Sequence, residues 1–325
     1  MKFTVIQCRE GAAANKPASA SRLMAGNVRG NLLGAICVSA CLTFSGCAIS
    51  KKTVVKPSEI RPAKEATEAE LLASYGGIVQ QIRSINAAVE LAPTAGSAYS
   101  GVIEEYHQVQ GFILAQKPAD IRVIGQAPVL AKNIFDMVSD GKTFRIYIPS
   151  KNQFIVGPAN LTRTAEKPIE NLRPQHLLDA LFWPEIGADE PTLFEEFDEA
   201  PNRYYIVTLL RAGARPKIQR RLWFDRADLS LARVEVYDES GRLVSDIRLS
   251  DWQPASTSAN QPSTSSVPGE SVSYPRHIVL RRPHDDYQLD IHITKLTLNE
   301  HISADRFTLA QPAGTKLTEI TAAKQ

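Results

Sequence analysis

The sequence predicts an α+β protein that is mainly antiparallel β: a half-open, curved β-barrel with helices covering or plugging its mouth. From about Val89 onward, apolar and polar residues alternate in many short runs, which is the period of strands with one buried face. Turn residues separate these runs, with few helical segments between them, which favours antiparallel neighbours. With 43% hydrophobic and 22% charged residues among 325, the composition is globular and large enough for a sizeable core.

The N-terminal segment has the features of an export signal. A basic stretch ending at Arg29 precedes the apolar run NLLGAICVSACLTFSGC, which is too short for a comfortable membrane-spanning helix. Its end, FSGC, is similar to a bacterial lipobox, in which the cysteine receives a diacylglyceryl group. We therefore expect residues 1–46 to be a lipoprotein signal peptide, with Met24 as an alternative start, and Cys47 to be lipidated.

A plain secretory signal with an incidental cysteine is the alternative. All four cysteines, at positions 8, 37, 41 and 47, lie at or before Cys47, so the remainder must fold without disulfides. Residues 47–66 mix Lys, Pro and small residues without periodicity and are expected to form a flexible tether. By analogy with bacterial lipoproteins, in which an aspartate after the lipidated cysteine favours inner-membrane retention, Ala48 favours a periplasm-facing location on the bacterial outer membrane.

The charge balance excludes a nucleic-acid partner. Residues 1–46 contain five Lys or Arg and one acid, so the rest of the chain holds 32 basic and 34 acidic residues. That balance lacks the basic footprint that phosphate backbones require. We expect a monomer whose partners are the membrane, through Cys47, and an acylated lipoprotein or lipid cargo, with a periplasmic carrier protein as a further candidate.

A single domain is expected over residues 67–320, and it begins with a helix. Thr67 and Glu70 form a capping-box pattern. The apolar residues that follow at helical spacing are Leu71, Tyr75, Ile78, Ile82 and Ile85.

A second, short helix is expected within residues 171–183, with Pro174 in its first turn and Pro184 ending it. It is either a lid over the barrel mouth or a plug in the core. Short turns at 140–141, 226–228 and 240–241 join strand hairpins. Residues 253–273, rich in Ser, Thr and Pro, are expected to be a disordered insertion.

The strand alternation predicts one continuous apolar face. Its candidate members are Phe144, Ile146, Ile148, Val207, Leu209, Leu222, Phe224, Val234, Val236, Leu289, Ile291 and Ile293. This face is either a filled core or a cavity for an apolar ligand.

The sequence offers no positive case for catalysis, a metal or a cofactor. It contains no nucleophile elbow, phosphate-binding loop, dinucleotide fingerprint or zinc-binding helix motif. The best metal-like grouping is His284, Asp285 and Asp286 with Asp290 and His292, and we interpret it as a solvated strand face behind an acidic turn. In IFDMVSDGKTFRIYIP, at 134–149, Asp140 and Gly141 are expected to form a turn, and Asp136 to face solvent.

Several motifs together resemble the periplasmic lipoprotein carriers LolA and LolB. They are GFILAQKP at 111–118, IRV at 121–123, VSDGKTF at 138–144 with YIP at 147–149, LN at 298–299, ISADRFTL at 302–309 and PAG at 312–314. Their order and spacing match over roughly residues 70 to 320.

This resemblance implies helices inside the mouth of a half-barrel that encloses an apolar cavity for acyl chains. It makes Lys117, Leu177, Leu181 and Phe182 the candidate lid. Soluble carriers have an arginine before the motif proline that hydrogen-bonds the lid, whereas this chain has Lys117, which lacks the planar guanidinium. With the predicted anchor, this favours the membrane-bound acceptor type, for which the 128–130 loop is a candidate apolar hook.

The expected function is therefore a lipid-anchored, non-enzymatic protein for lipoprotein or lipid transport. Two alternatives remain open at this point. One is a periplasmic sensor or regulatory interaction module on the same fold, and the other is an enzyme that uses the cluster from His284 to His292.

Overall fold

The computed structural model describes residues 61–97, 102–127, 132–159, 172–187, 189–199, 202–257 and 272–320. The predicted signal peptide, Cys47, most of the tether and the 128–130 loop lie outside these ranges. The described residues belong to one compact unit, Pro57–Gln325. Among them, no helix has the length and apolar character needed to cross a membrane.

A large β-sheet makes up most of the unit. Its strands are β1 (Ser84–Ser97), β2 (Val102–Glu105), β3 (Val109–Gln116), β4 (Asp120–Gln126), β5 (Asn133–Ser139), β6 (Thr143–Ile148), β7 (Gln153–Pro158), β8 (Thr192–Glu199), β9 (Asn202–Arg211), β10 (Lys217–Asp225), β11 (Leu231–Tyr237), β12 (Leu243–Pro254), β13 (Ser256–Thr257), β14 (Ser273–Arg282), β15 (Tyr287–Leu298) and β16 (Lys316–Glu319). The short 3-10 helices are η1 (Pro149–Lys151) and η3 (Ala304–Phe307).

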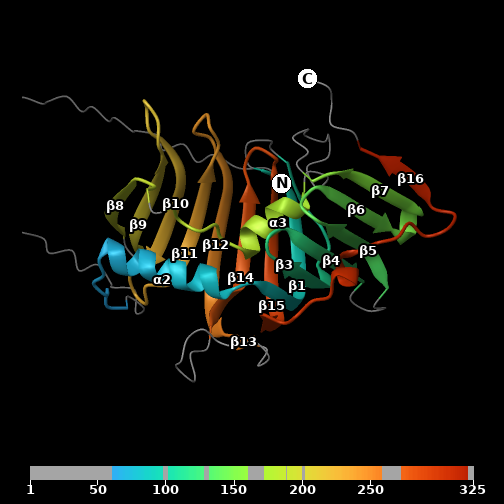
Figure 1. Ribbon diagram of the computed structural model, residues 1–325, viewed down its shortest axis with the longest axis horizontal. Coiled ribbons are helices and arrows are strands. Elements are labelled where there is room, and N and C mark those ends of the chain that lie inside the picture. Colours follow the sequence, from blue (N-terminus) through green and yellow to red (C-terminus); the bar gives the residue numbers. More distant parts are fainter. Residues whose placement is uncertain are drawn as a thin grey trace, which may run out of the picture. The chain divides into compact units, whose positions relative to one another are not determined.

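Hydrogen bonds join the strands in the order β16-β7-β6-β5-β4-β3-β1-β15-β14-β12-β11-β10-β9-β8, while β2 pairs with β1 and β13 pairs with β15. The pairings between described residues are antiparallel except for β16 with β7 and β13 with β15. The end strands β8 and β16 do not pair with each other in the part of the chain described, so the sheet is open, and it curves behind two helices (Figure 1). The predicted fold class is confirmed.

Helix α2 (Glu68–Gln81) begins at the predicted capping box, in which the Thr67 hydroxyl accepts from the Glu70 amide and the Glu70 carboxylate accepts from the Thr67 amide. Its buried residues are Leu71, Tyr75 and Val79. The helix ends at Gln81, so two residues of the predicted apolar stripe lie beyond it: Ile82 is the C-cap and Ile85 belongs to β1.

Helix α3 (Pro174–Leu181) is the predicted second helix, with Pro174 in its first turn. Proline is tolerated there because the first amides of a helix have no partner within the helix. Five of its eight residues are buried, and in Figure 1 α3 lies with α2 in front of the sheet. We call the face of the sheet under these helices the inner face and the opposite face the outer face.

The turn chemistry of the predicted hairpins is confirmed. Gly141 has φ 78° between β5 and β6, and Gly241 has φ 84° between β11 and β12. The Asp140 carboxylate accepts from the amides of Lys142, at 2.9 Å, and Thr143, at 2.7 Å, and these bonds lower the pKa of Asp140. The first hairpin is therefore held by its own turn, with Asp140 and Lys142 exposed.

Strand β1 was not predicted, although it is central to the sheet. It pairs along one side with β15, and along the other with β3 through Leu91 and with β2 from Thr94. Pro93 lies between the part of β1 that pairs with β3 and the part that pairs with β2. A proline, which has no amide hydrogen to donate, is tolerated at such a break in the pairing. The edge strands β8 and β16 were not predicted either.

The expected end of the tether is wrong by six residues, because residues 61–66 are held against the sheet. The Arg61 guanidinium pairs with Asp225 and Asp228, each at 3.2 Å, and the Lys64 amide donates to the Arg226 carbonyl at 2.7 Å. The expected insertion is also shorter at its start, because residues 253–257 belong to β12, β13 and their link.

Asp136 is buried, and the prediction that it faces solvent is wrong. It lies on the outer face with 7% exposure and forms a two-bond pair with Arg122, Nε to Oδ1 at 3.0 Å and Nη2 to Oδ2 at 2.7 Å. Arg122 also donates to the Arg306 carbonyl of η3 at 3.0 Å. Beside this pair, Leu114, Ile302 and Phe307 form a small apolar cluster, so the C-terminal segment covers this part of the outer face.

Candidate ligand site beneath helix α3

The inner face carries the apolar residues that the strand alternation predicts. One buried cluster contains Val207, Leu209, Leu222, Phe224, Val234, Leu289, Ile291 and Ile293, and Ile146 and Val236 pack against it. Phe144 is 2% exposed and Ile148 is partly exposed, and neither residue belongs to a buried cluster. The structure thus brings ten of these twelve residues into contact with one core.

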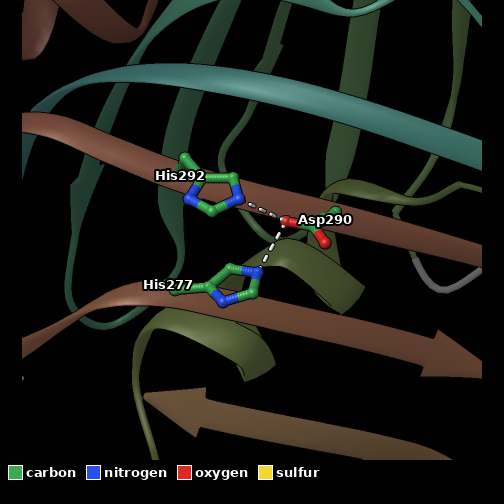
Figure 2. Close-up of side chains that lie close together, drawn as sticks. All are labelled: His277, Asp290 and His292. Atoms are coloured by element: carbon green, nitrogen blue, oxygen red, sulfur yellow. Dashed lines mark hydrogen bonds and ion pairs between the residues drawn. The ribbon is translucent and has the colours of Figure 1, made fainter. Parts of the chain in front are cut away.

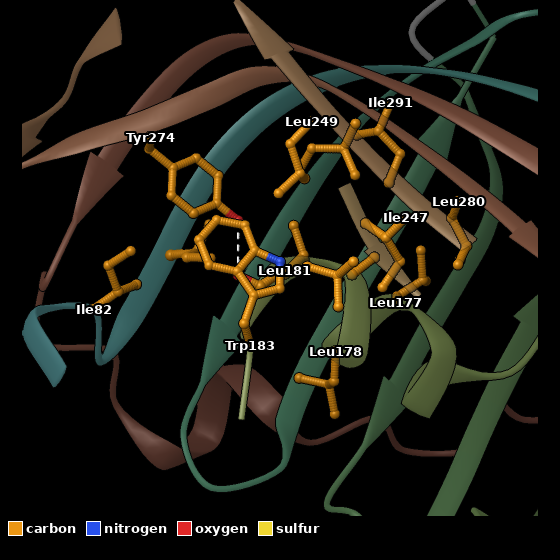
Figure 3. Packing of buried hydrophobic residues seen from close by; sticks show 14 of the residues in the cluster. Ile82, Leu177, Leu178, Leu181, Trp183, Ile247, Leu249, Tyr274, Leu280 and Ile291 are labelled. Atoms are coloured by element: carbon orange, nitrogen blue, oxygen red, sulfur yellow. Dashed lines mark hydrogen bonds between the residues drawn. The ribbon is translucent and has the colours of Figure 1, made fainter. Parts of the chain in front are cut away.

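Helix α3 fills the space over this face. Leu177 and Leu181, 2% and 1% exposed, face the sheet residues Ile247, Leu249, Leu280 and Ile291 (Figure 3). The helix therefore covers this part of the apolar surface in the conformation seen here. Of the two interpretations left open by the sequence, a packed interior describes the state seen here.

Polar contacts at the C-terminal end of α3 fix the helix to the sheet. The Tyr274 hydroxyl donates to the Leu181 carbonyl at 2.8 Å, and burial raises the pKa of Tyr274, which keeps this hydroxyl protonated. The next residue but one, Trp183, stacks on Tyr274 with ring centroids 5.9 Å apart and packs on Trp252 at 5.8 Å. The Trp183 indole Nε1 is buried and has no hydrogen-bond partner among the described residues.

The segment after α3 is tied to α2. The Pro184 carbonyl accepts from the Tyr75 hydroxyl at 2.7 Å and from Arg220 Nη1 at 3.0 Å. Arg220, which is 3% exposed, also pairs with Glu190 at 3.3 Å, and burial raises the pKa of Tyr75 to about 12. A cleft of about 450 Å³ lies beside these groups, between α2 and residues 185–192, and includes Leu72, Gly76 and Ile186 in its lining.

Lys117 contacts both helices. Its ammonium donates to the Val79 carbonyl of α2 at 2.7 Å and lies 5.7 Å from the ring centroid of Phe182, the residue that ends α3. Burial lowers the pKa of Lys117. Of the candidate lid residues, Lys117 thus contacts Phe182 directly, while Leu177 and Leu181 belong to the helix that Phe182 follows. The lysine contacts α2 through a single ammonium, without the planar guanidinium of an arginine.

The polar side of α3 is partly buried. His176 Nδ1 lies 2.5 Å from the Tyr287 hydroxyl, and the two rings stack with centroids 6.0 Å apart. Burial, with Arg282 and Arg173 nearby, lowers the pKa of His176 to about 3. Burial also raises the pKa of Asp179, which accepts from Gln175 at 2.8 Å. His176 is consequently neutral at neutral pH.

Sequence reasoning missed the residues that fasten α3: Tyr75, Tyr274, Trp183 and Arg220. Tyr75 was recognised only as an apolar stripe residue. A buried tyrosine or tryptophan usually needs a polar partner, and that is the signal that could have indicated them. Their partners are backbone carbonyls of a distant segment, which no sequence pattern specifies.

The grouping from His284 to His292 is not one cluster. Asp285 pairs with Arg282 at 2.7 Å within the turn, and His284 is exposed. Asp290 and His292 lie on the outer face of β15, where the third member beside them is His277 of β14.

These features define a class of architecture: an open antiparallel half-barrel whose apolar inner face is covered by two helices. No protein-family profile matches the sequence. No curated protein sequence matches it either.

Solved structures with a similar arrangement include three bacterial proteins. A LolA superfamily protein from Nitrosomonas europaea is 13% identical, with a TM-score of 0.43 over 75% of this chain and 99% of that chain. A DUF1329 family protein from Desulfovibrio piger is 12% identical, with a TM-score of 0.46 over 75% and 98%. An outer membrane lipoprotein-sorting protein domain from Vibrio parahaemolyticus is 9% identical, with a TM-score of 0.43 over 73% and 94%.

Proposed function

We propose that this protein is a lipid-anchored, non-enzymatic binding protein that takes acyl chains of a lipoprotein or lipid against its inner face at the bacterial outer membrane. The single observation that carries the proposal is the construction of α3. A short, separate helix covers a continuous apolar surface and is fastened by a few hydrogen bonds near its end.

Binding requires α3 to move, because its leucines occupy the apolar surface. Each methylene of an acyl chain that leaves water contributes about 0.8 kcal/mol, so a long chain offsets the loss of several leucine contacts. The helix leaves few polar groups unpaired when it moves, since its fastening groups are the hydroxyls of Tyr75 and Tyr274, the Lys117 ammonium and the Arg220 guanidinium, which water can reach once the segment lifts. Binding thus replaces the apolar contacts of the α3 leucines with apolar contacts of the acyl chain.

The unpaired indole of Trp183 supports a bound ligand with a polar group. A buried donor without an acceptor costs about 1–3 kcal/mol. An ester or amide oxygen at the head of an acyl chain would supply that acceptor. Trp183 follows α3 directly, so it is placed where a lifted helix exposes the inner face.

Lipidation at Cys47 is the second part of the proposal. Thirteen residues, 48–60, separate Cys47 from Arg61, the residue at which the chain is fixed on Asp225 and Asp228. An extended chain reaches about 3.5 Å per residue, so the domain would stay within about 50 Å of the bilayer. That arrangement suits a protein that receives cargo at the membrane.

The test is lipid capture by the chain with Cys47→Ala, purified without detergent. We expect native mass spectrometry to find one acylated molecule per chain after incubation with a diacylated lipopeptide, and none with the same peptide lacking its acyl chains. Mass spectrometry of the wild-type N-terminus tests the anchor separately. The proposal is contradicted if the purified chain carries no co-purified lipid and also takes up none of the added lipopeptide.

A further inference from the structure

The outer face carries a group of side chains that the proposed function does not use. His277 of β14 and His292 of β15 are directly paired across the two strands, and Asp290 lies two residues before His292 on the same face. Their ligand atoms all lie within 4.8 Å of one another. Figure 2 shows both imidazoles turned toward the Asp290 carboxylate.

The distances are close to those of a metal site. His277 Nε2 lies 2.8 Å and His292 Nε2 lies 3.3 Å from Asp290 Oδ1. Ligand atoms of a tetrahedral zinc site, each about 2.0–2.2 Å from the metal, lie about 3.4 Å apart. Small rotations of the three side chains therefore open the space for one ion. The two rings are stacked with centroids 4.1 Å apart, and the Nε2 atoms of both lie beside the same carboxylate oxygen.

A second contact orients one of the histidines. The other ring nitrogen of His277, Nδ1, lies 3.2 Å from the hydroxyl of Ser250 on β12. When Nε2 binds a metal, the ring proton is on Nδ1. The Ser250 oxygen is placed to accept a hydrogen bond from that N–H group. Metal-bound histidines usually have such a partner for their second nitrogen.

The strands that hold these residues are packed into the core. Ile278, Leu289 and Ile291 alternate with them on the same strands and are buried in the core of the inner face, at 0–2% exposure. The side chains of His277 and Asp290 are 30% and 28% exposed, and that of His292 is 54% exposed, so an ion reaches the site from solvent. On β1, Glu90 is directly paired with His292 and accepts from Gln108 at 2.7 Å.

We propose that His277, Asp290 and His292 bind a divalent transition metal ion of the zinc class, with Ser250 as a positioning residue. Two imidazoles and one carboxylate suit Zn²⁺ and exclude a preference for Ca²⁺ or Mg²⁺, which take oxygen ligands. Three protein ligands leave a position for water. The site lies on the face opposite α3, so it goes beyond the acyl-binding proposal and is tested independently of it.

The test is calorimetric titration of the purified full chain, free of any polyhistidine tag, with Zn²⁺. We expect one equivalent to bind, and His292→Ala and Asp290→Asn each to weaken binding at least about tenfold; Ser250→Ala should weaken it about tenfold or more through ring orientation. His284→Ala and His301→Ala, which remove exposed histidines elsewhere, are matched controls and should bind as the wild type does. Thermal unfolding in EDTA checks that every variant is folded.

Co²⁺ provides an independent readout, because its visible absorption reports the ligand set. We expect a nitrogen- and oxygen-ligand spectrum in the wild type that is lost in His277→Ala. Absence of stoichiometric Zn²⁺ binding in the wild type, or unchanged binding when His277 and His292 are both replaced by alanine, would overturn the proposal. So would equal affinity for Zn²⁺ and Mg²⁺.

Discussion

The Lys117 ammonium donates a hydrogen bond of 2.7 Å to the Val79 carbonyl, one of the last carbonyls of α2. A helix C-terminus leaves its final carbonyls without partners inside the helix, and a cation there is favourable. The same ammonium lies over Phe182 at the end of α3. One lysine thus connects the two helices that cover the inner face.

Replacing this lysine should loosen both helices. We expect Lys117→Met to lower the free energy of unfolding by about 1–2 kcal/mol, because a charged hydrogen bond is lost, and to speed acyl-chain uptake. Urea denaturation and stopped-flow uptake of a fluorescent fatty acid measure the two effects. Lys142→Met, at the exposed hairpin tip, is the control. Uptake no faster than that of Lys142→Met would argue against a role for Lys117 in holding the helices.

The Tyr274 hydroxyl holds the end of α3 more locally. Tyr274→Phe keeps the ring stacked on Trp183 but removes the donor to the Leu181 carbonyl. We expect a loss of about 1 kcal/mol in unfolding free energy and faster hydrogen exchange confined to residues 174–183. Tyr106→Phe, which removes an exposed contact to Glu104, should leave both measurements unchanged. Exchange that increases evenly over the whole sheet would contradict a local fastening.

His176 makes stability depend on pH. Its folded-state pKa of about 3 lies below the usual value of 6.5, so between these values the unfolded chain binds a proton that the folded chain does not. The contribution of His176 to stability is therefore full above pH 6.5 and is lost as the pH drops below it. The groups around His176 include Arg173, Arg282, Tyr287 and Asp179, and the raised pKa of Asp179 partly opposes this trend at lower pH.

We expect the melting temperature to fall between pH 7 and pH 5, and less steeply in His176→Gln than in the wild type. His301→Ala, which alters an exposed histidine, should keep the wild-type slope. Identical slopes in wild type and His176→Gln would show that this histidine does not stay neutral in the folded protein.

The Arg122–Asp136 pair fastens the C-terminal segment to the outer face. The side chains are 21% and 10% exposed, so removing one partner leaves a poorly solvated charge. We expect Asp136→Ala to cost about 3 kcal/mol, whereas Arg122→Met combined with Asp136→Leu should cost less, since no charge is then stranded. Chemical denaturation of both variants decides this. A double variant less stable than Asp136→Ala would contradict the argument.

Much of the fold follows from the sequence because strand alternation and turn chemistry are local. Residues such as Val207 and Leu209 are placed on the inner face by period alone, and Gly141 identifies a hairpin by its backbone freedom. Strand β1 was missed because its alanines, Pro93 and Gly96 weaken the alternating pattern of a strand. Its strand conformation is stabilised by pairing with β15 rather than by the intrinsic preferences of its residues.

The candidate sites were harder to predict because they depend on register. The pairing of His277 with His292 depends on the register of the hairpin formed by β14 and β15. The two histidines are fifteen residues apart, and nothing in the sequence near either of them indicates that they are paired. Asp136 occupies a position that the strand alternation assigns to the outer, solvent-facing side. It is buried because the C-terminal segment around η3 covers that part of the outer face.

Photo-crosslinking tests the central claim, that acyl chains replace α3 on the inner face, most directly. A lipopeptide with a diazirine in its acyl chain is bound to the protein and irradiated, and the labelled residues are mapped by mass spectrometry. We predict labels on the inner-face residues that α3 covers, such as Ile247, Leu280 and Ile291, together with faster hydrogen exchange in α3. Labels confined to exposed outer-surface residues such as Phe112 and Ile134, with α3 still protected, would contradict the account.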